Sequence, residues 1–557
     1  AVRYSANWAE EYRPKLVKTA KDGRVFVDTP MTRLFGKPPL MVAGMTPSTV
    51  SGEFVSAVMN AGYHVELAGG GHFAENMIRD KVQMIMDSVP AGLGVSMNCL
   101  FLNSFLWNLQ FPLIQQMRKE GFPMEGVCIG AGVPSPDVAD EIVTQFHAAG
   151  IKHIAFKPGS VATIRQVVAI AARHPYMPII LQWTGGRAGG HHSFEDMHQP
   201  ILETYGQIRA QKNIILLAGS GLGSAEDTLP YVTGDWALQF DYPPMPYDGV
   251  LFGSRVMIAK EGQAHDAVKQ AIIDAPGIED QDWEQTYTRE AGGVLTVKSE
   301  LGEPIHKIAT RGVKLWKELD DTVFNLPREK RPAVLASKKD YIIKRLNADF
   351  QKVWFGKKTD GSAVDLEDMT YAEVANRAVE LLYIKHQNRW IDISLRRFVG
   401  DFLRRIEERF ISTPTESKLP HYTLLDKPLE FVPEFLANYP EASTQLLTSE
   451  DVQYFISQCL RRDQKPVPFI PVFDNNNFEF WFKKDSLWQS EDLDAVPDQD
   501  VQRVCILHGP VAAKHAKKIN QPVKEILDEI HDGQVDGILN RYYQGNLAQV
   551  PTVEYLG

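Results

Sequence analysis

Residues that could carry out chemistry are concentrated in the stretch Leu181 to Phe194, LQWTGGRAGGHHSF. It begins in an apolar run, continues with four glycines within six residues, and then delivers two adjacent histidines, His191 and His192. Glycine lets the backbone approach a ligand closely. The pKa of histidine lies near neutrality, so its ring can donate and recover a proton. The stretch therefore predicts an enzyme loop above the end of a strand; the alternative is a surface loop with two solvated histidines.

Such a loop needs a framework that brings other segments to the same place, and the sequence contains eight similar apolar runs. Most are followed by a helical segment, and they are continuous rather than alternating, as in strands buried on both faces. Eight βα units within about 250 residues make up a closed barrel. We therefore predict the α/β class, with a (β/α)8 TIM-type barrel rather than an open doubly wound sheet. In chain order the runs are PLMVAGM, HVELAGGG, GLGVSMN, GVCIGAG, KHIAFKPG, PIILQWTGG, NIILLAGSGLGS and DGVLFGSRV.

The carboxyl ends of these runs hold the candidate binding residues, because a barrel of this kind places its active site there. The residues are small, polar or glycine, and no Asp, Glu, His or Cys cluster has the spacing of metal ligands, so we predict no catalytic metal. In chain order they are Gly44, Met45 and Thr46, then Asn98, Lys157, Gln182 and Thr184, then Gly219, Ser220 and Gly221, and finally Gly253 and Ser254.

The turns after the seventh and eighth runs, AGSGLGS and FGSR, combine glycine and serine. Such turns direct backbone N–H groups toward an anion, and barrels often bind phosphate after these two strands. We predict a phosphate site there; the alternative is two tight turns that serve packing alone. Asn98 and Gln182 could donate to or accept from the edge of a planar ring, or could equally be capping residues.

The overall composition argues against a nucleic-acid-binding protein and against a membrane-spanning protein. A net charge of −11 argues against a nucleic-acid partner, which requires a basic face. No apolar run is long enough to span a membrane. The four cysteines are scattered without C-x-x-C spacing, which is typical of a reducing compartment, so we expect a cytoplasmic protein.

A chain of 557 residues is too long for one ordinary domain. We predict an N-terminal lead-in over 1–37, the barrel with a helical extension over 38–326, a helical scaffold over 327–424, and a β-meander with further helices over 425–557. The last region has the β-like runs PVPFIPVF, FEFWFKK and QRVCILH. The chain begins without Met and ends abruptly, so we expect a piece of a longer polypeptide.

Several of these motifs resemble a known family. AGMTP, AGGH, AGSG and DGVLFGSR look like FMN-dependent barrels, which include bacterial flavin enoyl reductases and nitronate monooxygenases. Longer blocks are similar to the enoyl reductase region of the fungal fatty acid synthase β subunit, and together they cover nearly the whole chain. These blocks include MVAGMTPSTV, WTGGRAGGHHSFED, SELGEPIHKIATRGV, LNADFQKVWF and GDFLRRIEERF.

The resemblance implies FMN and NADPH as cofactors of a multifunctional enzyme of fatty acid biosynthesis. Hydride would pass from NADPH to the flavin and then to a trans-2-enoyl thioester on acyl carrier protein. The other domains and the α subunit of the synthase would be partners, and residues 327–557 would tie the reductase into the assembly. The nitronate-type FMN oxidase and a non-catalytic scaffold barrel are the alternatives.

The resemblance also implies roles for single residues. His191 matches the histidine of the Gly-Gly-His motif and would orient the thioester carbonyl or supply the proton, with His192 as the alternative. Lys157 would steady the reduced flavin, and His508 is interpreted as structural. By position, Gly44, Met45, Thr46 and Asn98 would line the flavin, and Gly219, Gly221, Gly253 and Ser254 would hold its phosphate.

Overall fold

The computed structural model describes residues 7–190, 192–193, 195–411, 417–419, 422–473, 477–485 and 487–554. The chain forms two compact units. The first comprises Ala1–Thr296, Glu303–Ile308 and Leu507–Gly557, and the second comprises Val297–Gly302 and Ala309–Ile506. The first unit is thus assembled from segments that are far apart in the sequence. The finer division into four regions stays a prediction.

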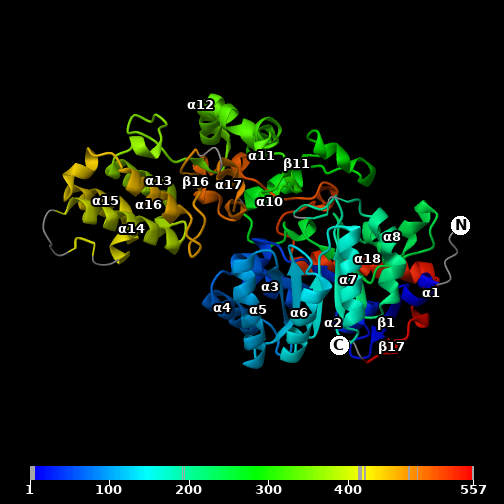
Figure 1. Cartoon of the computed structure of the whole chain (residues 1–557). Helices are drawn as coiled ribbons and strands as arrows, with labels where there is room; N and C mark the ends of the chain where they lie inside the picture. Colours follow the sequence, from blue (N-terminus) through cyan, green and yellow to red (C-terminus); the bar gives the residue numbers. More distant parts are fainter. Residues whose placement is uncertain are drawn as a thin grey trace. The chain divides into compact units, whose positions relative to one another are not determined.

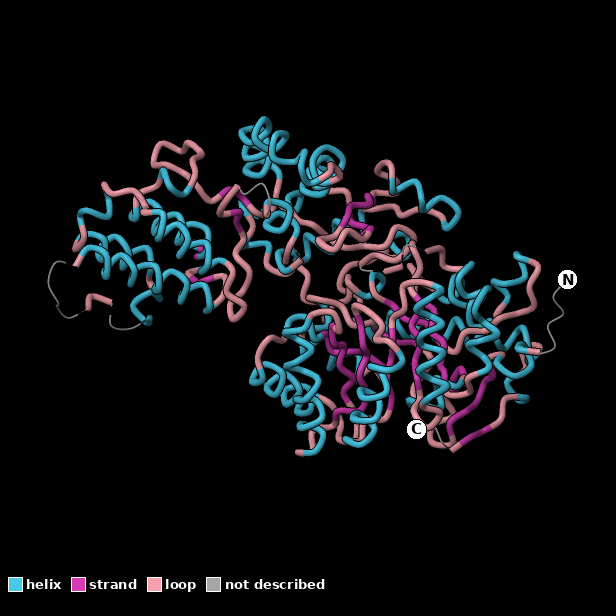
Figure 2. The backbone as a smooth tube through the Cα atoms, in the orientation of Figure 1, coloured by secondary structure: helices cyan, strands magenta, loops and turns pink. Residues whose placement is uncertain are grey.

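The first unit contains a closed barrel of parallel strands, drawn in magenta in Figure 2. The strands follow one another around the ring in chain order, and the ring closes where β10 pairs with β3. Each strand is one of the eight predicted apolar runs, so the predicted (β/α)8 barrel is confirmed. The strands are β3 (Leu40–Val42), β4 (His64–Ala68), β5 (Val95–Leu100), β6 (Met124–Gly130), β7 (His153–Phe156), β8 (Ile179–Trp183), β9 (Ile214–Ala218) and β10 (Gly249–Phe252).

A helix follows each strand from β3 to β9 and packs on the outside of the barrel (Figure 1). Ser51, Ser135 and Ser160 each begin one of these helices by accepting a backbone N–H of its first turn, a donor that would otherwise lack a partner. The helices are α3 (Gly52–Asn60), α4 (Glu75–Ser88), α5 (Ser104–Lys119), α6 (Pro136–Ala149), α7 (Val161–Arg173), α8 (Gln199–Ala210) and α9 (Ala225–Thr233).

The helix that covers β10 comes from the far end of the chain. Strand β10 lies between β9 and β3, and α18 (Val523–Tyr543) packs against both α9 and α3. A Cβ on Gly533 would lie 2.4 Å from the Cβ of Ala225 in α9, and one on Gly537 would lie 2.5 Å from a Leu229 methyl group. Only glycine permits this close approach of the two helices. The eighth βα unit is therefore completed by a segment that follows the whole second unit in the sequence.

The amino end of the barrel is closed by the N-terminal segment. Thr29 caps α2 (Pro30–Phe35), and Met31 from this helix joins the side chains that fill the barrel interior. A Cβ on Gly249, at the start of β10, would lie 2.2 Å from the Met31 sulfur. The helix is therefore packed tightly under the strands. Near it, α1 (Trp8–Tyr12) precedes a sheet in which β1 (Lys15–Thr19) pairs with β2 (Val25–Asp28) and with β17 (Thr552–Val553).

The remaining elements follow β10 in the sequence, and the second unit is mainly helical. No helix in the described part of the chain is long and apolar enough to cross a membrane. The helices are α10 (Asp266–Asp274), α11 (Arg311–Leu319), α12 (Arg331–Asp349), α13 (Tyr371–Leu382), α14 (Ile393–Phe410), α15 (Pro428–Ala437), α16 (Ser449–Cys459) and α17 (Phe478–Lys483). The short strands are β11 (Val294–Lys298), β12 (Pro304–Ile308), β13 (Val353–Trp354), β14 (Tyr383–Ile384), β15 (Arg389–Trp390) and β16 (Phe469–Ile470).

The β-meander expected over 425–557 is not what the described residues form. The run PVPFIPVF contributes only the two-residue strand β16, which pairs in parallel with β13. The run FEFWFKK is helix α17, because Phe478, Trp481 and Phe482 are buried at helical spacing and Phe482 stacks on Phe350 at 4.1 Å. Aromatic residues favour strands in general, and here the packing of one helical face overrides that preference.

Candidate active site

A buried carboxyl group lies at the carboxyl end of the barrel. Glu66, in the middle of β4, is only 1% exposed. Its Oε1 accepts hydrogen bonds from the Gly44 N–H at 3.2 Å and from the Asn98 amide at 3.2 Å. Its Oε2 accepts one from the Gln182 amide at 2.9 Å. Burying a carboxyl group without partners is costly, so donors from three strands or strand ends are needed to hold it there.

The carboxyl group of Glu66 also fixes how the two amides are turned. Both amides direct their NH2 groups toward it, Asn98 donating to Oε1 and Gln182 to Oε2. Their carbonyl oxygens then point away from Glu66. The carbonyl oxygen of Gln182 is buried and has no hydrogen-bond partner among the described residues. A ligand with an N–H donor would satisfy this oxygen.

Glu66 is not among the predicted site residues, because those residues lie at strand ends and Glu66 lies in the middle of the second run. A signal was present: HVELAGGG has one acidic residue inside an otherwise apolar strand. A carboxyl group in such a strand needs several donors. Its partners Asn98 and Gln182 were both predicted as site residues, and the structure brings them together.

Lys157, directly after β7, lies at the same end of the barrel. Its charge and that of Glu66 both act on the thiol of Cys128, which is buried in the neighbouring strand β6. Burial raises the pKa of this thiol well above its ordinary value, the Glu66 charge raises it further, and the Lys157 charge lowers it. The half-buried Lys157 is therefore close to the buried network, and its role at the mouth of the barrel stays a prediction.

The loop after β3 lies against the loops of its two neighbours. The Met45 sulfur lies 3.3 Å from where a Cβ on Gly253 would be, and the Thr46 hydroxyl lies 2.7 Å from a Cβ position on Gly70. A Cβ on Gly44 would lie 2.8 Å from the Asn98 side chain. The predicted residues of this loop therefore lie beside Gly253 and Asn98. The chain approaches itself so closely here that a side chain in place of Gly44 would collide with Asn98.

The two glycine–serine turns are neighbours, since β9 pairs with β10. Gly221 has a φ of +68°, a conformation that glycine adopts more readily than other residues. The glycine loop after β8 ties the turns together: Arg187 donates to the Ser220 carbonyl at 2.7 Å, and a Cβ on Gly189 would lie 2.8 Å from the Ser254 hydroxyl. The residues predicted to hold a phosphate therefore share one small region.

Arg187 is itself a buried residue whose role is structural. It is 4% exposed, and besides the Ser220 carbonyl it donates to the Tyr231 hydroxyl at 3.1 Å and pairs with Asp280. Each of its three guanidinium nitrogens donates to a group of the protein. It therefore holds the glycine loop against the turn after β9.

Of the two candidate histidines, His191 lies outside the described residues, so its catalytic role stays a prediction. His192 is buried, its Nδ1 bonds to the Gly190 carbonyl, and its ring stacks on His306 at 5.1 Å. Burial lowers the pKa of His306 to about 3, with a further lowering by His192, so His306 is neutral. Its Nε2 donates to the Gly186 carbonyl at 2.7 Å. These contacts support a packing role for His192 within the loop.

Thr184 and its neighbours shape the rest of this loop. The Thr184 carbonyl accepts the Ser193 N–H at 3.1 Å, and the Ser193 hydroxyl donates to the Gly159 carbonyl at 2.6 Å. The loop after β8 is therefore bonded to the loop after β7, which carries Lys157. No group of three or more His, Cys, Asp or Glu side chains in the described part of the chain could hold a metal ion.

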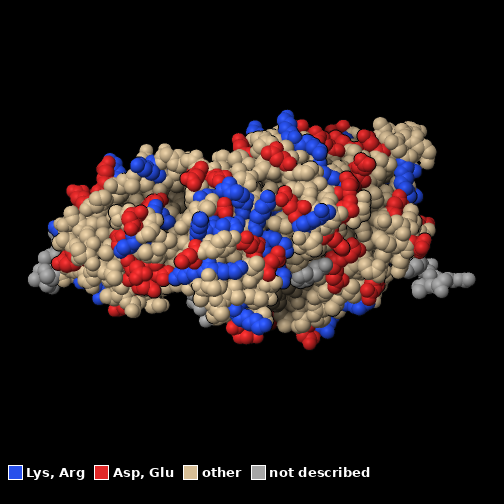
Figure 3. All heavy atoms as spheres, turned by 90° about the horizontal axis from the view of Figure 1, so that it is seen from above, with Lys and Arg blue, Asp and Glu red and all other residues tan. Residues whose placement is uncertain are grey.

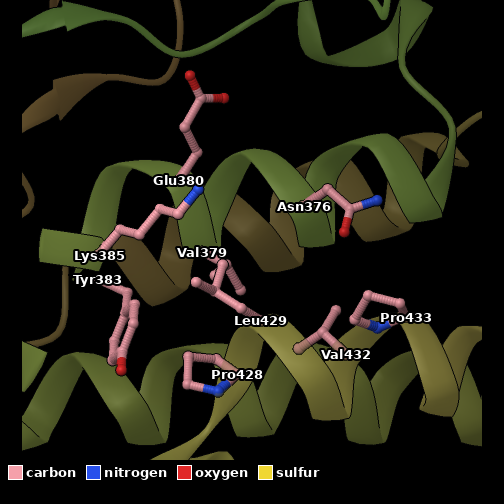
Figure 4. Close-up of a pocket in the computed structure, with 9 residues that line it drawn as sticks. All are labelled: Asn376, Val379, Glu380, Tyr383, Lys385, Pro428, Leu429, Val432 and Pro433. Atoms are coloured by element: carbon pink, nitrogen blue, oxygen red, sulfur yellow. The ribbon is translucent and has the colours of Figure 1, made fainter. Parts of the chain in front are cut away.

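The pocket shown in Figure 4 is separate from these residues in the fold, because all of its lining residues belong to the second unit. It has a volume of about 210 Å³ and lies between α13 and α15, with Val379, Leu429 and Val432 facing one another. None of the predicted site residues lines it. On the face seen in Figure 3, basic and acidic side chains are interspersed, without a continuous area of one sign.

Buried polar atoms of the protein at the barrel mouth show whether its residues fit a flavin mononucleotide. The Gln182 carbonyl oxygen and the Ser220 hydroxyl are both buried without a partner among the described residues. The first could accept an N–H from the edge of a planar ring, and the second lies in a turn predicted to bind phosphate. The residues present therefore fit this cofactor.

The fold and the site define a TIM-type barrel with a polar, glycine-lined mouth. Within that class, the chain belongs to the family described as fatty acid synthase subunit beta/Fas1-like, helical, whose model matches residues 178–527. The match begins in the barrel at β8 and runs through the second unit to α18. The predicted resemblance to the fungal fatty acid synthase β subunit is thereby confirmed.

Individual relatives agree with this family. The chain is 52% identical over 556 residues to the fatty acid synthase subunit beta of Saccharomyces cerevisiae, covering 100% of this chain and 27% of that protein. It is 51% identical to the fatty acid synthase beta subunit aflB of Emericella nidulans, covering 100% of this chain and 26% of that protein. The chain therefore spans about a quarter of the length of these relatives.

A solved structure similar to this chain is the enoyl reductase domain of MlnA from the macrolactin biosynthesis cluster of Bacillus amyloliquefaciens. The TM-score is 0.49 and the identity 13%, over 93% of this chain and 99% of that one. At this score the likeness supports no functional inference.

Proposed function

We propose that this chain is the enoyl reductase segment of a fungal-type fatty acid synthase. It would use FMN and NADPH to reduce trans-2-enoyl thioesters, carried on acyl carrier protein, to saturated acyl thioesters. Membership of the fatty acid synthase β-subunit family supports the pathway. The barrel supports a catalytic role, because enzymes of this fold hold their active sites at the carboxyl ends of the strands.

The observation that carries the proposal is the arrangement around Glu66. Its carboxyl group turns the amides of Asn98 and Gln182 so that a buried acceptor, the Gln182 carbonyl oxygen, has no partner among the described residues. The pyrimidine edge of an isoalloxazine ring presents an N–H group that matches an acceptor of this kind. A hydrogen bond in a buried site is worth more than one in water, so the match would select for such a ring.

Other residues of the chain would complete the site. Gly44, Met45, Thr46 and Gly253 would lie along the ring, and Lys157 would favour negative charge on it. When bound, FMN would supply the hydride relay between NADPH and the enoyl thioester. His191 would orient the thioester carbonyl or hold the proton that is added at the α-carbon.

The proposed partners follow from the same family. Acyl carrier protein would present the thioester, and the other domains and the α subunit of the synthase would surround this segment. We also propose a cytoplasmic location, and the four free, buried cysteines support it.

The absorbance spectrum of the purified chain, before and after NADPH is added, tests the proposal. A yellow protein that is bleached by NADPH and reoxidised by a crotonyl thioester is the expected result. His191→Ala should retain the flavin and lose most thioester reduction. A colourless protein that takes up no FMN would instead support a scaffold role. Oxygen-dependent turnover of a nitroalkane without NADPH would indicate a nitronate-type oxidase.

A further inference from the structure

Apolar side chains are exposed on two neighbouring loops at the carboxyl end of the barrel. Leu102 and Phe105 follow β5 and are 74% and 41% exposed, and Val138, in the first turn of α6, is 49% exposed. The loops are neighbours because β5 pairs with β6. Exposed apolar residues that occur singly are ordinary, whereas a group of them at one place marks a binding surface. We call Leu102, Phe105 and Val138, together with the half-buried Leu100, the apolar rim.

The two loops also lack charged residues. No Asp, Glu, Lys or Arg occurs in residues 88–117, which include β5 and its loop, or in residues 126–136, which include most of β6 and its loop. These four residue types make up 23% of the whole chain, so their absence from both loops is a local feature. A hydrocarbon can cover such a surface without removing charged groups from water, which would be costly. The apolar rim therefore suits an uncharged, apolar ligand.

Leu100 makes the apolar rim continuous with the candidate active site. It lies two residues beyond Asn98 in β5, so both side chains face the same side of the strand. A Leu100 methyl group lies 3.6 Å from where a Cβ on Gly70 would be, and the Thr46 hydroxyl lies 2.7 Å from the same position. Leu100 therefore lies beside two residues that were predicted to line the site, Asn98 and Thr46.

Leu102 is held in place although it is exposed. Its N–H donates to the Ala131 carbonyl at 3.1 Å, which extends the pairing of β5 with β6 beyond the strand ends. A Cβ on Gly132 would lie 2.8 Å from the Leu102 Cγ, and Gly132 has a φ of +113°, a conformation that favours glycine. The Leu102 side chain thus lies on the backbone after β6. Its other surface remains open to a ligand.

We propose that the apolar rim receives the hydrocarbon chain of the acyl thioester and sets a preference for longer chains. The inference rests on the proposed function and assigns substrate contacts to residues that the sequence analysis did not single out. Leu100 lies about 7 Å beyond Asn98 along β5, since each strand residue rises about 3.3 Å. A four-carbon chain held beside Asn98 ends below the rim, whereas a ten-carbon chain crosses Leu100 and reaches Leu102.

The test compares two substrates of the FMN-loaded chain, crotonyl-pantetheine with four acyl carbons and trans-2-decenoyl-pantetheine with ten. The measured quantity is the ratio of kcat/KM for the longer thioester to kcat/KM for the shorter one. Leu102→Ser should lower this ratio by about 10-fold, because covering an exposed leucine side chain is worth about this factor. Val138→Ser should lower it in the same direction. Any loss of folded protein cancels, since both substrates are measured on one preparation.

Leu238→Ser is the matched control. Leu238 is 50% exposed and lies in the short 3₁₀ helix Asp235–Phe240 between α9 and β10, at the amino end of the barrel. This variant should keep the wild-type ratio. A wild-type ratio in Leu102→Ser would overturn the proposal. Equal slowing of both chain lengths in Leu102→Ser, seen only when the thioesters are carried on acyl carrier protein, would also overturn it, because the rim would then dock the carrier.

Binding of saturated thioesters separates this inference from the proposed function, because binding requires no reduction. Dissociation constants of butyryl- and decanoyl-pantetheine are measured by titration calorimetry. Each methylene that the rim covers should tighten binding by up to about 4-fold. If the wild-type chain reduces no enoyl thioester, the proposed function is wrong and this measurement decides. Tighter binding of the decanoyl thioester that is lost in Leu102→Ser supports the rim, and equal binding of both thioesters to the wild type overturns it.

Discussion

Replacing Glu66 by glutamine tests the central contact of the candidate site. Oε1 of Glu66 accepts from two donors, one of which is the backbone N–H of Gly44 and cannot turn, whereas Oε2 accepts from the Gln182 amide, which can. The new NH2 group should therefore take the Oε2 position. It would then face the NH2 group of Gln182, and the Gln182 amide would turn over to relieve this contact.

The turned amide would present an NH2 group to the ligand where the wild type presents a carbonyl oxygen. A ring N–H would lose its acceptor and meet a donor. Leaving a buried polar group unpaired costs about 1–3 kcal/mol, which weakens FMN by about 5- to 150-fold. The stability of the flavin-free protein should change by no more than about 1 kcal/mol, because the hydrogen bond between positions 66 and 182 is restored in reverse.

Fluorescence titration with FMN and urea unfolding without it measure the two quantities. The matched control is the double variant Glu66→Gln, Gln182→Glu, in which the exchanged carboxylate again offers an acceptor to the ligand. It should recover most of the lost affinity. Wild-type affinity in Glu66→Gln, or a loss that the double variant does not reverse, would refute the assigned orientation of the amide.

Two further predictions concern stability. Gly533→Val should lower the free energy of unfolding by about 1–3 kcal/mol, because a Cβ at position 533 meets Ala225 at 2.4 Å. The control is Asp532→Val, on the exposed side of α18. Equal urea midpoints for the two variants would contradict this packing. Burial lowers the pKa of His531 from 6.5 to about 3. As the pH falls, His531 is therefore protonated in the unfolded chain before it is protonated in the folded chain. Its contribution to the free energy of unfolding is complete above about pH 6.5. That free energy then falls by about 1.4 kcal/mol per pH unit as the pH approaches 3. His531→Gln, which keeps an acceptor for the Val27 N–H, should flatten the pH dependence of stability over that range, and an unchanged slope would show that His531 does not cause it.

The barrel could be predicted from the sequence because its strands are buried on both faces. A continuous apolar run such as IILLA, before a glycine turn, has few other interpretations, and eight such runs specify closure. Since parallel strands present their carboxyl ends at one edge, Asn98 and Gln182 could be assigned to a common site. The residue that joins them, Glu66, was missed because it lies within a strand and not at its end.

Other features depend on contacts between distant segments, which the sequence pattern does not report. The helical spacing of α18 predicts a helix and not its position beside β10. Likewise, His306 and His508 carry no local motif, and their place beside the glycine loop and the strand turns results from the tertiary fold. The aromatic residues of α17 favour a strand locally, and the packing of Phe482 on Phe350 decides otherwise.

The position of α18 has a consequence for how the protein is made. During synthesis the ribosome releases β3 to β10 well before α18, and the residues of the second unit emerge between them. Until then one side of the nascent barrel lacks its outer layer, with apolar surface that chaperones recognise. A nonsense codon anywhere in the second unit would therefore leave all eight strands of the barrel without the helix that covers β10.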